Sequence, residues 1–303
     1  MGTGTLPQSS AMPSSNAAGA ADLLELTKPR ITLMVVLTTA AGFWAAASSV
    51  DLLAFAGTLL GTALIASGAS CLNQVIELRT DALMHRTRTR PVAAGRTPPR
   101  AATIFGVTIS IAGAATLLAA ANPLTAGLGI LTLLLYTLIY TPMKRVSSLC
   151  TVVGAVPGAI PPMMGWTAVR DNVPVEAWVL FGILFFWQMP HFLAIAWMYR
   201  EDYERGLQPM LPVDDDDGSA TARQMVLYSL GLLPVSLLPA LLGMAGGVYF
   251  GGAFLLGLVF LGSAIYAART HTVDAARLLL RVSVFYLPLL LILLAATKDA
   301  AAR

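Results

Sequence analysis

The stretch LLAFAGTLLGTALIASGASCLNQVI, from Leu52 to Ile76, carries no charged side chain and is followed at once by ELRTD, from Glu77 to Asp81. About 20 apolar residues in a helix suffice to cross the hydrocarbon core of a bilayer. We therefore predict that Leu52–Ile76 spans a membrane and ends in a strongly polar segment. The other helices and the candidate site are predicted from this segment outward.

Similar charge-free stretches follow one another along most of the chain. One of them, residues 224–268, is too long for a single span, and its Met244-Ala-Gly-Gly-Val248 centre predicts a turn between two helices. The predicted spans are then Ile31–Ser49, Leu52–Ile76, Ala101–Asn122, Pro123–Met143, Val146–Val169, Ala177–Tyr199, two within 224–268, and Leu278–Ala296. This pattern predicts an all-α polytopic membrane protein, with nine transmembrane helices in a single bundle.

The composition excludes a soluble protein. Apolar residues make up 56% of the 303 residues and charged residues only 12%, with a mean hydropathy of +0.73; soluble domains carry about 25% charged residues. The net charge of +3 could suggest a nucleic-acid partner, but no polar domain carries a basic patch. We therefore expect no nucleic acid among the partners and the lipid bilayer as the surroundings.

The basic residues predict the orientation. With the N-terminus inside, 16 of the 19 Lys and Arg residues fall on the inner face, as the positive-inside rule requires. We expect a multi-pass protein of a bacterial plasma membrane, with a cytoplasmic N-terminus and the C-terminus outside. Residues 1–21 are expected to be a disordered tail, residues 22–298 the transmembrane domain, and residues 299–303 a short C-terminal tail.

The inner face also receives the two longest connections, residues 79–100 and 200–223, and the unusual carboxylates. Asn73, Glu77 and Asp81 are four residues apart and would line one helical stripe about 12 Å long. Carboxylates at a membrane edge are costly and point to a function. Oxygen ligands of this kind suit Mg²⁺, which proteins often bind through one or two carboxylates together with substrate phosphates.

Basic residues lie close to this stripe in the sequence. Arg86 and Arg90 follow it, and Lys144 and Arg145 follow the fourth span. Arg and Lys bind phosphate oxygens, so the set predicts a site for a diphosphate and Mg²⁺. Taken alone, these arginines are more typical of topology determinants and headgroup contacts, and the Asp214–Asp217 run is typical of a solvated loop.

Several motifs resemble the UbiA-type intramembrane prenyltransferases, and within that family the members that act on haem. The first is Asn73-x-x-x-Glu77-x-x-x-Asp81-x-x-Met84-x-Arg86-Thr87-x-x-Arg90-Pro91. The others are Leu26-Thr-Lys28-Pro29-Arg30-Ile31, Tyr140-Thr-Pro-Met-Lys144-Arg145, Gly154 to Trp166, Trp187-Gln-Met-Pro190-His191-Phe192, Tyr199-Arg-Glu-Asp202-Tyr203-x-x-Gly206 and Pro209-Met-Leu-Pro-Val213. The resemblance covers roughly residues 26–288.

The resemblance implies an enzyme that transfers a farnesyl group from farnesyl diphosphate to a vinyl group of haem b, with addition of water, in a cavity open toward the cytoplasmic side. It implies Mg²⁺ as cofactor, and it leaves a downstream haem A-forming membrane enzyme open as a partner. The family's second metal motif has two aspartates four residues apart; here Asp202 fills the later position and Met198 stands at the earlier one.

The expected site residues follow from these motifs. Metal and catalytic contacts are assigned to Asn73, Glu77, Asp81 and Asp202, and diphosphate contacts to Arg86, Arg90, Lys144, Arg145 and Arg200. Contacts with haem or the prenyl chain are assigned to His191, Trp187, Tyr203, Lys28 and Arg30. For His191, a hydrogen bond to a neighbouring helix is an equally good interpretation.

Two alternative functions remain open at this stage. The first is a UbiA-type enzyme with another acceptor, such as an aromatic acid, a quinone precursor or a chlorophyllide. The second is a polytopic transporter, although transporters place ionisable groups near the bilayer midplane and here the carboxylates gather at one face.

Overall fold

A computed structural model describes residues 19–298 of the chain. The expected C-terminal tail and residues 1–18 of the expected N-terminal tail lie outside this range, whereas Ala20 and Ala21 already belong to a helix. The helices are α1 (Ala20–Leu26), α2 (Pro29–Ala46), α3 (Leu52–Ile76), α4 (Leu78–Leu83), α5 (Pro99–Ala120), α6 (Pro123–Leu134), the π-helical η1 (Leu135–Tyr140), α7 (Thr141–Met143), α8 (Cys150–Ala159), α9 (Pro161–Arg170), α10 (Val175–Met198), α11 (Arg200–Arg205), α12 (Leu211–Asp214), α13 (Ser219–Leu241), α14 (Gly247–Thr270) and α15 (Val273–Ala296).

Within residues 19–298, nine helical segments are long and apolar enough to cross a membrane. This confirms the predicted number of spans, and the long 224–268 stretch is indeed divided, with a turn between α13 and α14. Three spans begin two residues earlier than expected, and two of these begin at a proline, Pro29 and Pro99. Proline is favoured in the first turn because its missing N–H would have no helical partner there.

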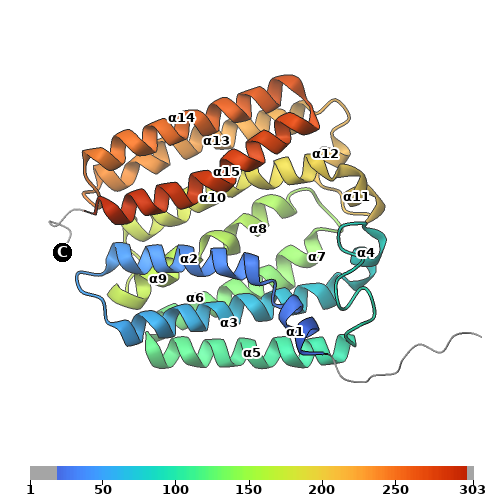
Figure 1. Cartoon of the computed structure of the whole chain (residues 1–303), viewed down its shortest axis with the longest axis horizontal. Helices are drawn as coiled ribbons and strands as arrows, with labels where there is room; N and C mark the ends of the chain where they lie inside the picture. The colour runs from blue at the N-terminus through green and yellow to red at the C-terminus, as the bar shows by residue number, and fades with distance from the viewer. Residues whose placement is uncertain (1–18, 299–303) are drawn as a thin grey trace, which may run out of the picture.

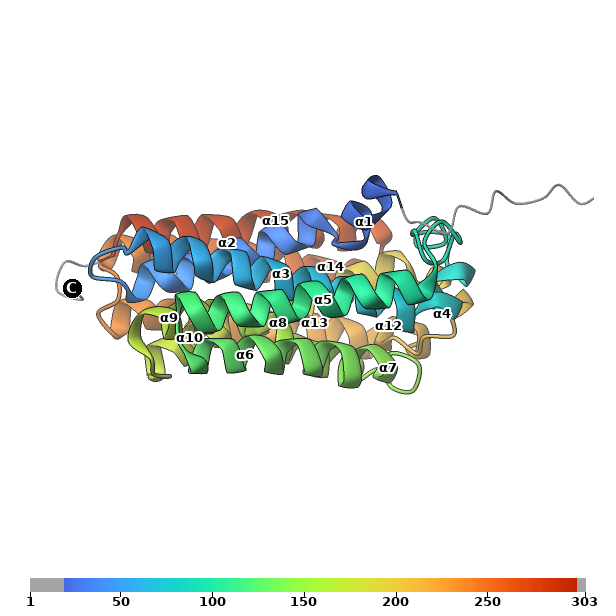
Figure 2. The same ribbon diagram turned by 90° about the horizontal axis from the view of Figure 1, so that it is seen from below.

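Consecutive spans run in opposite directions through the bundle (Figures 1 and 2). Most of the short helices lie at one end of it. Figures 1 and 2 both place α1, α4, α7 and α12 at this end, opposite the end of α15. We call it the α4 end. The last turn of α3, which carries Asn73, lies at the α4 end.

The outer surface of the bundle is apolar. Large side chains such as Ile111, Leu138 and Phe285 are 65%, 65% and 67% exposed, and water would make such a continuous apolar surface unfavourable. Lipid chains would cover it without this cost. By contrast, 61% and 56% of an apolar 18-residue window are buried in the spans Cys150–Arg170 and Val175–Met198, against 28–39% in the other spans, so α8–α9 and α10 form the centre.

Two spans depart from a regular α-helix. The fifth is divided at Ile160 between α8 and α9, where Pro161 follows directly and lacks the N–H that a continuous helix needs. The fourth contains the π-helical turn η1, in which the Thr141 N–H donates to the carbonyl of Tyr136 five residues earlier. The sequence reading predicted neither break. The fourth span ends at the α4 end, and the fifth span begins there.

Small residues allow α3 to approach α5 closely. A Cβ atom on Gly68 would meet the Ser110 side chain and would lie 2.7 Å from the carbonyl oxygen of Gly106. Small residues at helix interfaces are the usual means of close packing between membrane helices. The approach fixes the position of the helix that carries the candidate site.

Candidate active site

The predicted stripe is intact where α3 gives way to α4. Glu77 lies at the junction, but its N–H still donates to the Asn73 carbonyl (2.9 Å), and the Asp81 N–H donates to the Glu77 carbonyl (2.8 Å). This spacing keeps Asn73, Glu77 and Asp81 on one side of the chain. All three are at most 3% exposed, so the stripe faces the protein and not the lipid.

Three cations from separate parts of the chain meet this stripe. Lys144 Nζ lies 2.8 Å from Glu77 Oε1, Arg90 Nη1 lies 2.7 Å from Asp81 Oδ2 and 3.8 Å from Glu77 Oε2, and Lys28 Nζ donates to Asn73 Oδ1 at 2.9 Å. We call these six residues the carboxylate cluster. The structure therefore brings together Asn73, Glu77, Asp81, Arg90 and Lys144, as the sequence predicts, and adds Lys28.

Burial and the neighbouring charges shift the pKa values of the cluster in different directions, and burial raises the pKa of the Asp81 carboxyl. Burial alone would raise the pKa of the Glu77 carboxyl, but Lys144, Lys28 and Arg90 outweigh burial and hold it below its ordinary value. Burial, together with the nearby Arg90, lowers the pKa of Lys28 to about 7. The cluster thus favours the ionised form of Glu77, whereas the pKa of Lys28 lies near neutral pH.

The oxygen atoms of this cluster fit Mg²⁺ by their chemistry. Two carboxylates and one amide oxygen are hard ligands, and among the described residues no group of three His, Cys, Asp or Glu side chains could hold a metal ion by itself. A metal here would therefore need further oxygen atoms from a bound diphosphate and from water, which is the usual situation for Mg²⁺.

Asp202 has different partners from the cluster carboxylates. Its Oδ1 accepts from the backbone N–H of His85 (3.1 Å) and from Arg205 (2.6 Å), and its Oδ2 accepts from the backbone N–H of Arg86 (3.0 Å). These hydrogen bonds outweigh burial and hold the pKa of Asp202 below its ordinary value. Asp202 thus fixes the loop that links α4 to Arg90.

The remaining predicted diphosphate residues lie apart from the carboxylate cluster. The Arg86 guanidinium lies over the rings of Tyr199 (5.2 Å) and Tyr203 (5.6 Å) and donates to the Tyr203 hydroxyl. Arg145 donates to the carbonyl of Ile76. Arg200 is exposed and lines a cleft beside α11. Arg90 and Lys144 are therefore the two predicted diphosphate residues that face the carboxylates.

The predicted haem or prenyl residues are also separated. His191 Nδ1 lies 2.7 Å from Ser283 Oγ on α15, and Trp187, stacked on His191, donates to the Ser283 carbonyl. This is the alternative interpretation of His191, a hydrogen bond between helices. Arg30 is exposed at the start of α2. The roles of these residues toward a substrate stay predictions.

Two residues that the sequence reading did not single out belong to the site. Thr141 Oγ1 accepts from Asn73 Nδ2 at 3.2 Å and donates to the Tyr136 carbonyl, and the Tyr140 ring lies 4.5 Å from Lys144 Nζ. Both sit at the end of the π-helical turn. The motif that contains them was recognised, but only its basic residues were assigned a role.

The Asp214–Asp217 run is in part buried and structural. Asp215 is 8% exposed and accepts from the backbone N–H groups of Ala220 and Thr221 in the first turn of α13. Asp217 accepts from the N–H of Ser219. The expectation of a fully solvated loop is therefore wrong for Asp215, because unpaired N–H groups at a helix start attract a carboxylate.

Comparisons with known proteins agree with this geometry. The profile described as the UbiA prenyltransferase family matches residues 35–293. The fold resembles a solved digeranylgeranylglyceryl phosphate synthase (TM-score 0.77, 14% identity, 91% of this chain and 97% of that one). It also resembles a UbiA homolog from Archaeoglobus fulgidus bound to DMAPP and Mg²⁺ (TM-score 0.69, 16% identity, 91% and 98%).

The chain belongs to the UbiA prenyltransferase family, as its motifs predicted. Among curated relatives, the protoheme IX farnesyltransferase of Solibacter usitatus is 49% identical over 279 residues, covering 89% of this chain and 96% of the relative. The enzyme of the same name from Salinibacter ruber is 44% identical over 274 residues, covering 90% and 97%. The match therefore extends over nearly the whole length of both proteins.

Proposed function

We propose that this protein transfers a farnesyl group from farnesyl diphosphate to a vinyl group of haem b, giving haem O and diphosphate. The observation that carries the proposal is the buried carboxylate cluster, in which Glu77 and Asp81 face Arg90 and Lys144. The relatives named for this activity, at 41–49% identity, support the choice of donor and acceptor.

The cations of the cluster act on the leaving group. When the C–O bond of farnesyl diphosphate breaks, both electrons stay with the diphosphate, and Lys28, Arg90 and Lys144 stabilise its growing negative charge. A vinyl group of haem b then supplies the electron pair of the new C–C bond. Water adds to the resulting cation and loses one proton, which leaves the hydroxyl group of haem O.

Asn73, Glu77 and Asp81 would hold Mg²⁺ between the protein and the diphosphate. Bound there, the ion supplies further positive charge for the departing diphosphate oxygens. With a diphosphate bound, Lys144 and Arg90 would exchange their carboxylate partners for phosphate oxygens, for which an ammonium and a guanidinium are both suited. Asp202, as predicted from the family's second motif, would add to the metal site only if it released the backbone N–H groups of His85 and Arg86.

We also propose that the α4 end faces the cytoplasm of a bacterial cell and that the C-terminus lies outside, with residues 22–298 as one catalytic domain whose cavity opens at the α4 end. The concentration of basic residues at this end supports the orientation. The orientation is tested by placing single cysteines in loops at either end of the bundle and treating intact cells with a thiol reagent that does not cross the membrane. Cysteines at the α4 end should stay unlabelled. Interaction with a downstream haem A-forming enzyme stays a prediction of the family resemblance.

The activity is tested with the purified full chain in lipid nanodiscs. Haem b, farnesyl diphosphate and Mg²⁺ are expected to yield haem O and diphosphate, detected by chromatography and mass spectrometry, and chelation of Mg²⁺ should stop the reaction. Prenylation of an aromatic acid, a quinone precursor or a chlorophyllide in place of haem b would overturn the choice of acceptor. Transport of substrate without product would overturn the enzyme class.

A further inference from the structure

A second site lies at the α4 end, on the other side of the loop that follows α4. It is a cleft of about 710 Å³ between the end of α10, helix α11, the His85–Arg86 backbone and the turn between α14 and α15. This volume lies in the range of roughly 300–1,000 Å³ that is usual for small-molecule sites. Neither Glu77 nor Asp81 lines it.

The lining of this cleft combines guanidinium groups with flat apolar side chains. Arg86 is held in place by the rings of Tyr199 and Tyr203, and four of the five N–H groups of an arginine remain available when one bonds to a tyrosine hydroxyl. The side chain of Arg200 forms no hydrogen bond or ion pair within residues 19–298, and the residue is exposed and lines the cleft. Trp197 and Met198 supply the apolar part of the lining.

The lining of the cleft has an excess of positive charge, with three arginines (Arg86, Arg200 and Arg205) and two carboxylates (Glu201 and Asp202). Asp202 already pairs with Arg205 and accepts from two backbone N–H groups. Glu201 also lines the cleft and is exposed to solvent. Arg86 and Arg200 are therefore two guanidinium groups with free donors, and each matches the two oxygen atoms of a carboxylate.

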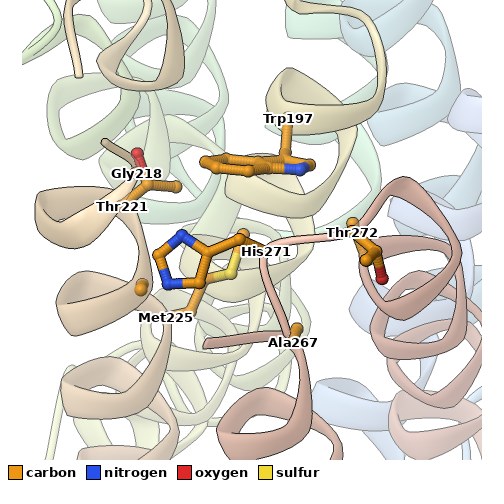
Figure 3. Close-up of a pocket in the computed structure, with 9 residues that line it drawn as sticks. Trp197, Gly218, Thr221, Met225, Ala267, His271 and Thr272 are labelled. Carbon is orange, nitrogen blue, oxygen red and sulfur yellow. The ribbon is translucent and has the colours of Figure 1, made fainter. Parts of the chain in front are cut away.

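Trp197 and His271 form one wall of the cleft, and they pack against each other with almost no space behind them. Trp197 packs edge to face on His271 at 5.8 Å, as Figure 3 shows. The neighbouring pocket has a volume of only about 10 Å³, enough for a single water. A Cβ atom on Gly218, whose φ is +73°, would collide with Trp197 and lie 2.8 Å from His271 Nδ1.

A single loop connects the cleft with the carboxylate cluster. The backbone N–H groups of His85 and Arg86 are held by Asp202, and four residues after Arg86, Arg90 pairs with Asp81. Thr87 Oγ1 donates to the Asp81 carbonyl at 3.0 Å between them. A ligand bound at Arg86 would thus be next to the diphosphate site, separated from it by the thickness of this loop.

We propose that this cleft binds the propionate edge of the haem acceptor, with one carboxylate on Arg86 and the other on Arg200. The inference rests on the proposed function, since it assigns the acceptor. Haem b carries its two propionates on one edge and its vinyl groups on the opposite, apolar edge. With the propionates held by Arg86 and Arg200, the vinyl edge points away from these arginines and is the edge left free to meet the farnesyl group beside the loop.

The test compares haem b with its dimethyl ester, which lacks both negative charges. Binding is followed by the Soret absorbance of the full chain in phosphatidylcholine nanodiscs. Wild type should bind haem b at least about tenfold more tightly than the ester, and Arg200→Gln and Arg86→Gln should each lose about tenfold for haem b and little for the ester, the size of one charge-assisted hydrogen bond. Arg223→Gln, an exposed arginine at the same end that does not line the cleft, is the matched control and should bind like wild type.

Each other outcome overturns the assignment in a recognisable way. Equal losses for haem b and the ester would mean that the substitution acts on folding, which thermal unfolding of each variant measures directly. A loss of farnesyl diphosphate binding with normal haem binding would return Arg200 and Arg86 to the diphosphate site. In a separate arm, the protein is purified from membranes that contain phosphatidylglycerol and the retained lipid is measured. Retention of this anionic lipid by wild type but not by Arg200→Gln, with unchanged haem binding, would identify the cleft as a lipid headgroup site. If wild type makes no haem O at all, the proposed function fails; if it does and both variants bind haem normally, only the cleft assignment fails.

Discussion

The two acidic motifs at the α4 end have the same chemistry but opposite surroundings. Glu77 and Asp81, at the α3–α4 junction, face the side chains of Lys144 and Arg90, which can turn to another anion. Asp202, on α11, pairs with the side chain of Arg205 but also accepts from the backbone N–H groups of His85 and Arg86, which are fixed parts of a loop. A carboxylate with mobile cationic partners can receive a metal and a diphosphate, whereas one that accepts from the main chain is better suited to hold that main chain in place.

The largest effect is expected at the α3–α4 junction. Asp81→Asn and Glu77→Gln should each reduce the rate of haem O formation by about 10²–10³, the usual loss when one electrostatic contact to a developing charge is removed. The rate is measured by chromatography of extracted haems with purified variants. Glu204→Gln, an exposed carboxylate of α11, serves as the control and should retain the wild-type rate. Normal rates in Asp81→Asn at saturating Mg²⁺ would remove Asp81 from the metal site.

The Mg²⁺ requirement separates the two motifs more sharply than the rate does. Asp81→Asn should raise the Mg²⁺ concentration for half-maximal activity by about tenfold, because the metal loses one charged ligand. Asp202→Asn should leave that concentration unchanged. An equal increase in both variants would make Asp202 a metal ligand, as the family's second motif predicts.

Asp202 itself should act through its loop. Asp202→Ala removes the acceptor of two backbone N–H groups and should lower kcat/KM by about tenfold, whereas Asp202→Asn keeps one acceptor oxygen and should lose less. Hydrogen exchange at the amides of His85 and Arg86 should become faster in the same order. Unchanged exchange in Asp202→Ala would show that the carboxylate does not hold the loop.

A smaller effect is expected for a cation of the cluster. Lys144→Ala should raise KM for farnesyl diphosphate by about tenfold, the usual scale of one charge-assisted hydrogen bond, with a lesser change in kcat. Lys144→Arg should recover part of the affinity. Steady-state kinetics measure both constants, and an unchanged KM and kcat in Lys144→Ala would exclude Lys144 from the diphosphate site.

The smallest effect is expected for Arg145, which is adjacent to Lys144 in sequence but not in the cluster. Its guanidinium donates to the carbonyl of Ile76, so Arg145→Gln should change kcat/KM by less than about threefold, as for most exposed substitutions. The same kinetic assay applies. A loss as large as that of Lys144→Ala would mean that Arg145 turns to the diphosphate when substrate binds.

The spans and the stripe were predictable because each depends on local sequence. Charge-free length predicts a membrane helix whatever its neighbours are, and a spacing of four places Asn73, Glu77 and Asp81 on one side of it. The identity of their partners is a tertiary matter. Lys28 precedes the first span, and only the packing of the start of α2 beside the end of α3 brings its ammonium to Asn73.

The π-helical turn escaped prediction for a different reason. Residues 135–140 read as an ordinary apolar stretch, and no residue type signals a π-helical turn as proline signals a break. For Asp202 the motif was recognisable in the sequence and suggested a metal ligand. A motif does not reveal whether its carboxylate faces a ligand or a backbone amide, and here it accepts from two backbone N–H groups.

The π-helical turn has a further consequence for the length of the fourth span. It accommodates one residue more than a regular helix would need to reach the same depth, and each residue of an α-helix turns the chain by about 100°. If residues 135–140 were wound as a regular α-helix instead, this extra residue would turn everything beyond it by about 100° around the helix axis. Thr141 and Lys144 would then be directed toward a different neighbour, so this surplus residue sets the angle at which the fourth span meets Asn73 and Glu77.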